Sequence, residues 1–119
     1  MQTRYRLRGH RDKATNAISH ELYVRIWYNE GGLRDFVTAT VAGNRELAVT
    51  KIGNQPAYVG RRFGAHEEWI GIPLDDAWLN SIRSSGFDVR LKAQSGHEIL
   101  LSVPAAYVTA YLDSVSTLR

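Results

Sequence analysis

The chain of 119 residues contains no cysteine. This absence excludes disulfide bonds, a thiolate nucleophile, cysteine-ligated zinc and iron–sulfur clusters. It does not identify the compartment, because proteins without disulfides occur in reducing and in oxidising environments. Proline is also scarce, with three residues, and no proline-rich linker or low-complexity tract divides the chain. We therefore expect a single domain over residues 1–119 whose core forms without disulfides or metal.

Long apolar runs are missing as well. No stretch approaches the roughly 20 apolar residues that a membrane-spanning helix needs. The first residues, Met1-Gln-Thr-Arg-Tyr-Arg, lack the apolar segment of a signal peptide. The sequence as written therefore predicts a soluble chain, and its aromatic residues supply large side chains for the core.

Positive charge is concentrated at the N-terminus. Residues 1–20 carry five basic side chains and one acidic side chain, a net charge of +4, so the other 99 residues carry a net charge of −1. Within this segment Tyr5 and Leu7 alternate with Arg4, Arg6 and Arg8. The alternation predicts a half-buried edge strand with a guanidinium face, so we expect a basic N-terminal strand or arm over residues 1–20.

Alternating apolar residues predict further strands. Residues 22–28 place one apolar set on one face, and Tyr23, Arg25 and Trp27 on the other. A turn at residues 29–32 leads to residues 36–41, which we expect to form the second arm of a hairpin. Extended segments are also expected at residues 4–8, 47–52, 57–59, 69–74, 87–93 and 99–103.

Two helices are expected among these strands. Asp75 has the features of an N-cap and Gly86 those of a left-handed stop, which predicts a helix over residues 76–85. Pro104 suits a first helical turn, and the apolar spacing that follows predicts a second helix over residues 104–116. The stripe of this helix consists of Tyr107, Val108, Tyr111, Leu112 and Val115. The predicted fold class is α+β, a mainly antiparallel β sandwich or half-barrel with one internal and one C-terminal helix.

The segments that carry these elements also resemble a known family. The stretches are Gly71-Ile-Pro-Leu, Gly86-Phe-Asp-Val-Arg-Leu-Lys-Ala-Gln-Ser-Gly-His-Glu, Val103-Pro-Ala-Ala-Tyr-Val-Thr-Ala-Tyr-Leu and His20-Glu-Leu-Tyr-Val. Together they resemble a family of small bacterial envelope domains, secreted or of lipoprotein type, whose function is unknown. The resemblance implies a periplasmic or outer-membrane-anchored location if Met1 is an added start on a trimmed mature domain, and otherwise a cytoplasmic one. Relatives often carry cysteines near the loop equivalent to residues 55–66, and this chain departs from them there.

Catalytic and metal-binding motifs are incomplete. His66-Glu67-Glu68 begins like a zinc-protease helix, but Ile70 stands where the second histidine is required. We therefore expect His66 to be a solvated loop histidine. The remaining histidines, His10, His20 and His97, are expected in turns or at strand ends.

Other enzyme signatures are absent too. The sequence contains neither Gly-x-Ser-x-Gly nor a phosphate-binding glycine loop. The neighbouring carboxylates Glu67-Glu68 should point to opposite sides of a strand, and the Asp75-Asp76 pair is expected at a helix N-terminus. We expect no catalytic residue, metal or cofactor, and an enzyme whose site cannot be identified from the sequence stays an alternative.

The basic segment is the strongest candidate binding feature. Its members are Arg4, Arg6, Arg8, Arg11 and Lys13, with Tyr5 interleaved. Arginine suits bidentate contacts with carboxylate or phosphate. If the segment binds a partner, we expect an envelope protein or an anionic membrane surface or, as an alternative, nucleic acid bound weakly. We favour the interpretation in which these charges serve no partner and keep a solvated edge strand from aggregating.

A second candidate feature is the aromatic pair Tyr23 and Trp27. An open face would make them a patch for a protein or glycan partner. We expect them to be buried in the core instead, because both faces of this strand carry apolar side chains and the helices must cover one of them. The motifs predict a non-catalytic interaction module, and the family resemblance implies that it is associated with the bacterial envelope.

Overall fold

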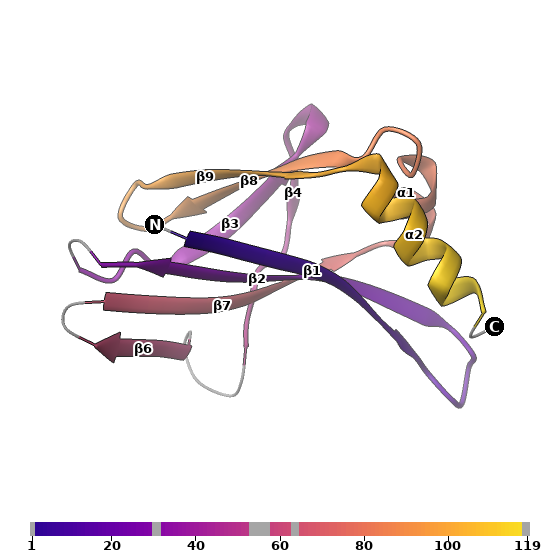
Figure 1. Cartoon of the computed structure of the whole chain (residues 1–119), viewed down its shortest axis with the longest axis horizontal. Coiled ribbons are helices and arrows are strands. Elements are labelled where there is room, and N and C mark those ends of the chain that lie inside the picture. The colour runs from indigo at the N-terminus through magenta and orange to yellow at the C-terminus, as the bar shows by residue number, and fades with distance from the viewer. Residues whose placement is uncertain (1, 30–31, 53–57, 63–64, 118–119) are drawn as a thin grey trace.

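The computed structural model describes residues 2–29, 32–52, 58–62 and 65–117, and only the backbone of residues 58–62 and 65 (Figure 1). Every pairing between its strands is antiparallel. The elements in chain order are β1 (Gln2–Arg11), β2 (Ile18–Tyr28), β3 (Phe36–Val41), the 3-10 turn η1 (Ala42–Asn44), β4 (Arg45–Leu47), β5 (Thr50–Lys51), β6 (Tyr58–Arg62), β7 (Ala65–Leu74), α1 (Asp76–Ser81), β8 (Phe87–Ala93), β9 (Glu98–Val103) and α2 (Ala105–Ser116). The predicted α+β class with a mainly antiparallel arrangement is confirmed.

The strands form two sheets. The first has the order β1-β2-β7-β5, with β6 also paired to β7, and the second has the order β4-β3-β8-β9. Figure 1 shows the sheets as two layers, with α1 and α2 together at one end of the molecule. The chain therefore changes sheet three times, between β2 and β3, between β4 and β5, and between β7 and β8.

The core lies between the inner faces of the two sheets. Leu22, Val24 and Ile26 of β2 are fully buried, as their alternation predicts. The same cluster of buried side chains includes Val89 and Leu91 of β8, so both sheets share one core. Residues at alternate positions of β2 face the outer side of the first sheet.

The internal helix is shorter than expected. Asp75 is the N-cap, and its Oδ2 accepts a hydrogen bond from Trp78 N at 3.0 Å. The helix ends at Ser81 because Ile82 leaves the helical region, with φ −108° and ψ 11°. The expected helix over residues 76–85 is thus wrong in its last turn. Gly86 follows with φ +71°, in a place where a Cβ would overlap the carbonyl oxygen of Val103.

The C-terminal helix agrees with its prediction within one residue, and Pro104 is its N-cap. Val108, Leu112 and Val115 are its buried side chains. The Tyr107 hydroxyl accepts a hydrogen bond from Leu7 N in β1, at 2.9 Å.

A second tyrosine bridges the edges of the sheets. The Tyr5 hydroxyl of β1 donates to the Ser102 carbonyl of β9 at 3.0 Å, and its ring lies 6.0 Å from that of Tyr107. Burial, and next to it the nearby Tyr107, raise the pKa of Tyr5. These tyrosines occupy one backbone group on each of two edge strands, the Leu7 N–H of β1 and the Ser102 carbonyl of β9.

The expected hairpin between residues 22–28 and 36–41 is wrong. The partners of β2 are β1 and β7, whereas β3 pairs with β4 and β8 in the other sheet. The connection turns at Asp35, which has φ +61°. Turn residues in a sequence predict that the chain changes direction, but they do not show whether the strands before and after the turn pair with each other.

A buried carboxylate holds this crossing in place. Glu68 of β7 is 0% exposed, and it accepts hydrogen bonds from the Tyr28 hydroxyl at 2.6 Å, Asp35 N at 3.2 Å and Phe36 N at 3.0 Å. Lys51 donates to the Asp35 carboxylate at 2.5 Å and to the Phe36 carbonyl at 2.9 Å. Three donors compensate for the lost hydration of the carboxylate. Burial, and then the hydrogen bond to Glu68, raise the pKa of Tyr28.

Removing the Glu68 charge tests this role. Glu68→Gln replaces one acceptor oxygen with an amide that faces the same donors, so we expect the free energy of unfolding to fall by about 3 kcal/mol. Glu67→Gln, the neighbouring substitution on the outer face, should cost less than about 1 kcal/mol. Urea unfolding followed by tryptophan fluorescence measures both. Equal losses in the two variants would contradict the role of Glu68.

Candidate functional site

The outer face of the first sheet gathers arginine and aromatic side chains from three neighbouring strands. Cross-strand register places Arg4 opposite Arg25 and Arg6 opposite Tyr23, and Arg25 is in turn opposite Trp69. We name this surface the arginine-aromatic face. Its members are Arg4, Arg6, Arg8, Tyr23, Arg25, Trp27 and Trp69.

Cation–π contacts order this face. The Tyr23 ring has the guanidinium carbons of Arg6 and Arg8 at 5.4 and 4.7 Å from its centroid. The Arg25 guanidinium carbon lies 5.8 Å from the centroid of the Trp69 ring. Guanidinium groups over aromatic rings are held in place while their remaining N–H donors stay available.

Two carboxylates on the same face neutralise two of the four arginines. Glu21 accepts from Arg8 Nε at 2.6 Å, and its carboxylate lies against Gly71, where a side chain would overlap it. Glu67 pairs with Arg25 and accepts from Trp69 Nε1 at 2.7 Å.

The other two arginines of β1 remain available. Within the part of the chain that the structure describes, Arg4 and Arg6 form no ion pair with a carboxylate. Arg4 also lines a hollow of about 360 Å³ together with Gln2, Arg25 and Trp27. Trp27 is 37% exposed there, so a positive charge and an open indole share one hollow.

The expected burial of Tyr23 and Trp27 is wrong. Tyr23 is half-buried and Trp27 is exposed. Neither helix covers their face, because α2 attaches to β1 through Tyr107 and turns its apolar stripe toward the core. The inner apolar side chains of β2 form the core, whereas Tyr23 and Trp27 on its outer face are in contact with solvent.

The side chains of the basic segment do not share one face, because successive residues of a strand point to opposite sides. Arg4, Arg6 and Arg8 are exposed on the outer face, which confirms the guanidinium face of an edge strand. Arg11 lies at the end of β1 opposite Ile18, at a position of the other alternation, and Lys13 lies in the turn that follows. The five predicted residues therefore do not form one surface. Tyr5 faces inward and is no member of it.

His20 is a buried residue that sequence reasoning assigned to a strand end. Its side chain is 0% exposed, with Nε2 at 2.6 Å from Asp76 Oδ1 and Nδ1 at 2.7 Å from the Tyr111 hydroxyl. The three groups are ordered like a catalytic triad, but the Tyr111 hydroxyl lies against the backbone, at 2.6 Å from where a Cβ on Gly9 would stand. The contact cross-links β2, α1 and α2.

The expectation of a solvated His66 is wrong too. His66 is buried in β7 and stacks on Tyr28, with ring centroids 5.4 Å apart. Its neighbours Glu67 and Glu68 point to opposite faces, as expected.

Among the described residues no three His, Asp or Glu side chains converge on a metal site. The helices in the described ranges are also too short and too polar to cross a membrane.

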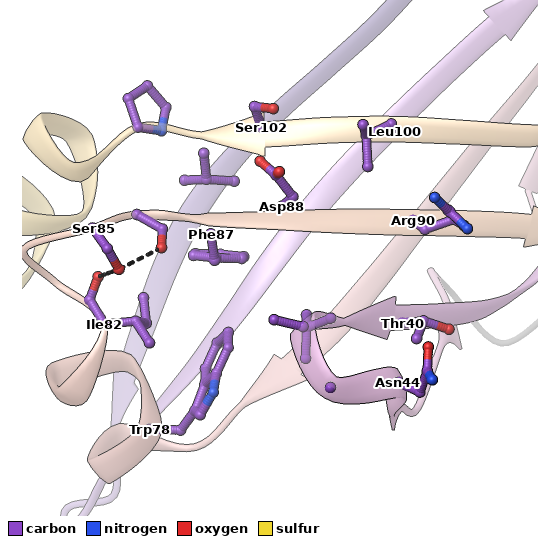
Figure 2. A pocket seen from close by; sticks show the side chains of 16 residues that line it. Thr40, Asn44, Trp78, Ile82, Ser85, Phe87, Asp88, Arg90, Leu100 and Ser102 are labelled. Carbon is purple, nitrogen blue, oxygen red and sulfur yellow. Dashed lines mark hydrogen bonds between the residues drawn. The ribbon is translucent and has the colours of Figure 1, made fainter.

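A larger groove lies on the outer face of the second sheet (Figure 2). It encloses about 720 Å³ between β3, β8 and β9, the turn η1 and helix α1. Trp78 and Phe87 form its apolar end, and Asp88 and Arg90 line it further along β8. Sequence reasoning missed this groove, because its walls come from elements that are far apart in the chain.

Comparisons with known proteins add no relative. No protein-family model, curated protein or solved structure was found to match the chain. The site is therefore interpreted from its own geometry.

The His20 cross-link predicts a change of stability at alkaline pH. Burial, followed by the Asp76 charge, raises the pKa of Tyr111 from 10.0 to about 12. The pKa of Tyr111 is higher in the folded state than in the unfolded state, so the protonated hydroxyl favours folding. Its contribution to the free energy of unfolding is complete below about pH 10 and is lost as the pH rises toward about 12. Tyr111→Phe should be less stable than the parent at neutral pH, and the difference should narrow over that interval.

Thermal unfolding across the alkaline range measures this narrowing, and tyrosinate absorbance follows ionisation directly. Tyr23→Phe removes a tyrosine hydroxyl from the outer face and serves as the matched control for the loss of one tyrosine from the absorbance signal. A difference between Tyr111→Phe and the parent that stays constant over this interval would contradict the assignment.

Proposed function

We propose that this protein is a non-catalytic interaction module that binds an acidic protein partner through its arginine-aromatic face. One observation carries the proposal: Arg4 and Arg6 have no carboxylate partner among the described residues, and Arg4 shares a hollow with the exposed Trp27. A carboxylate from a partner would complete the ion pairs that the chain leaves open.

The composition of the face supports a protein partner. Arginine, tryptophan and tyrosine are the side chains that contribute most often to the affinity of protein interfaces. The rings of Tyr23 and Trp69 are already held by neighbouring guanidinium groups, so binding immobilises few additional side chains there. A preorganised surface with two unneutralised charges fits a short acidic segment.

Nucleic acid is the second candidate, because Tyr23, Trp27 and Trp69 provide aromatic surfaces beside the arginines. The carboxylates of Glu21 and Glu67 on the same face oppose it, since they would repel phosphates. With only Arg4 and Arg6 unneutralised, we expect few phosphate contacts and weak binding at physiological salt. An acidic protein is therefore the better account.

Two finer inferences accompany the proposal. We infer that the sheets form a sandwich, because the edges of β1 and β9 are linked by the Tyr5 side chain and no ladder joins them among the described strands. We also propose a bacterial envelope location, periplasmic or outer-membrane-anchored, and this rests on the sequence resemblance alone.

Binding of defined probes tests the function. A labelled peptide of alternating glutamate and tyrosine should bind at about 0.15 M salt, and its glutamine counterpart should not. The double variant Arg4→Ser/Arg6→Ser should weaken peptide binding about tenfold, because it removes the two open charges. Arg90→Ser/Lys92→Ser removes the same charge from the other sheet and should leave binding unchanged.

Competing partners are distinguished in the same assay. Single- and double-stranded oligonucleotides and vesicles containing phosphatidylserine replace the peptide as titrants. Micromolar oligonucleotide binding that is lost in Arg4→Ser/Arg6→Ser would overturn the proposal in favour of nucleic acid. Vesicle binding with the same dependence would identify an anionic membrane as the partner instead.

A further inference from the structure

The groove on the second sheet has the size and form of a small-molecule site. Its volume of about 720 Å³ lies within the range of roughly 300 to 1,000 Å³ that is typical of ligand pockets. It lies on the outer face of the second sheet, away from the arginine-aromatic face of the first. An inference about it is therefore independent of the proposed function.

One end of the groove is apolar and preformed. The rings of Trp78 and Phe87 meet edge to face, with centroids 5.2 Å apart and planes at 69°. Both rings are only half-buried, and Ile82 lies beside them in Figure 2. Helix α1 ends at Ser81, and the turn that follows brings Ile82 and Ser85 to the groove. Both rings also pack against the core, and the Arg45 guanidinium carbon lies 5.7 Å from the centroid of the Trp78 ring. The rings are therefore held in place, and their exposed parts can contact a bulky apolar group.

The rest of the groove presents two opposite charges. Asp88 and Arg90 are two residues apart on β8, so both point to the outer side, and both are exposed. Neither forms an ion pair with any residue in the described ranges. Each has a hydroxyl residue opposite it in register, Ser102 for Asp88 and Thr40 for Arg90.

We propose that this groove binds a small zwitterion with a bulky apolar side chain, chemically an aromatic or branched α-amino acid. Arg90 would hold the carboxylate, Asp88 the ammonium group, and Trp78 and Phe87 the side chain. A simple carboxylate would meet the uncompensated charge of Asp88, and a simple amine would meet that of Arg90. Only a ligand with both charges satisfies both residues at once.

Three probes separate the contribution of the ligand's carboxylate from that of its ammonium group. Phenylalanine carries both charges, phenylpropionate lacks the ammonium group, and phenylethylamine lacks the carboxylate. In titrations of the whole chain followed by the indole N–H resonance of Trp78, phenylalanine should bind about three to ten times more tightly than either analogue. Equal affinity for the three probes, or no shift of that resonance by phenylalanine, would overturn the proposal.

Variants that remove one charge test whether Arg90 binds the ligand's carboxylate and Asp88 its ammonium group. Arg90→Gln should reduce phenylalanine binding to the level of phenylethylamine, and Asp88→Asn should reduce it to the level of phenylpropionate. Lys92→Gln removes a charge from the same face of β8 outside the groove, and should leave the affinity for phenylalanine unchanged. These side chains are exposed, so the variants should fold, and thermal unfolding verifies this. An effect of Lys92→Gln equal to that of Arg90→Gln would show general charge attraction and overturn the site.

Discussion

The arrangement of the two sheets depends on one buried carboxylate. Glu68 lies in the core side of β7 and bonds the end of β2 and the start of β3 at once, through the Tyr28 hydroxyl and the amides of Asp35 and Phe36. A carboxylate without hydration requires several donors, and here most of them are backbone groups at the point where the chain leaves one sheet for the other. The need to satisfy Glu68 therefore determines where β3 can begin.

Because the chain crosses between the sheets after β2, each sheet has its own outer face, and the two faces carry different side chains. The first sheet presents arginine and aromatic side chains in cation–π contact, and its charge is only half neutralised by Glu21 and Glu67. The second presents a groove whose apolar end is built by α1 and whose charged part is built by β8. Both helices lie at one end of the molecule (Figure 1), so neither sheet has its outer face covered along its length.

The candidate site was only partly accessible to sequence reasoning. The guanidinium face of Arg4, Arg6 and Arg8 follows from alternation alone. Tyr23 and Trp27 were predicted to lie in the core, because the sequence of a strand does not show which of its faces a helix will cover. The role of His20 was missed because its partner Tyr111 lies 91 residues away in the chain. The groove was missed because β3, α1, β8 and β9 form it together.

What the sequence by itself determined is local. The alternation of β2 and β8, the cap at Asp75 and the start of α2 after Pro104 all depend on residues within a few positions of one another. Only the tertiary structure decided that β2 and β3 belong to different sheets and that Tyr23 and Trp27 stay outside. These outcomes depend on Glu68, 32 residues beyond Phe36, and on the docking of α2 against β1, 100 residues away at Leu7 and Tyr107. Such contacts form only when the core assembles, and local periodicity carries no information about them.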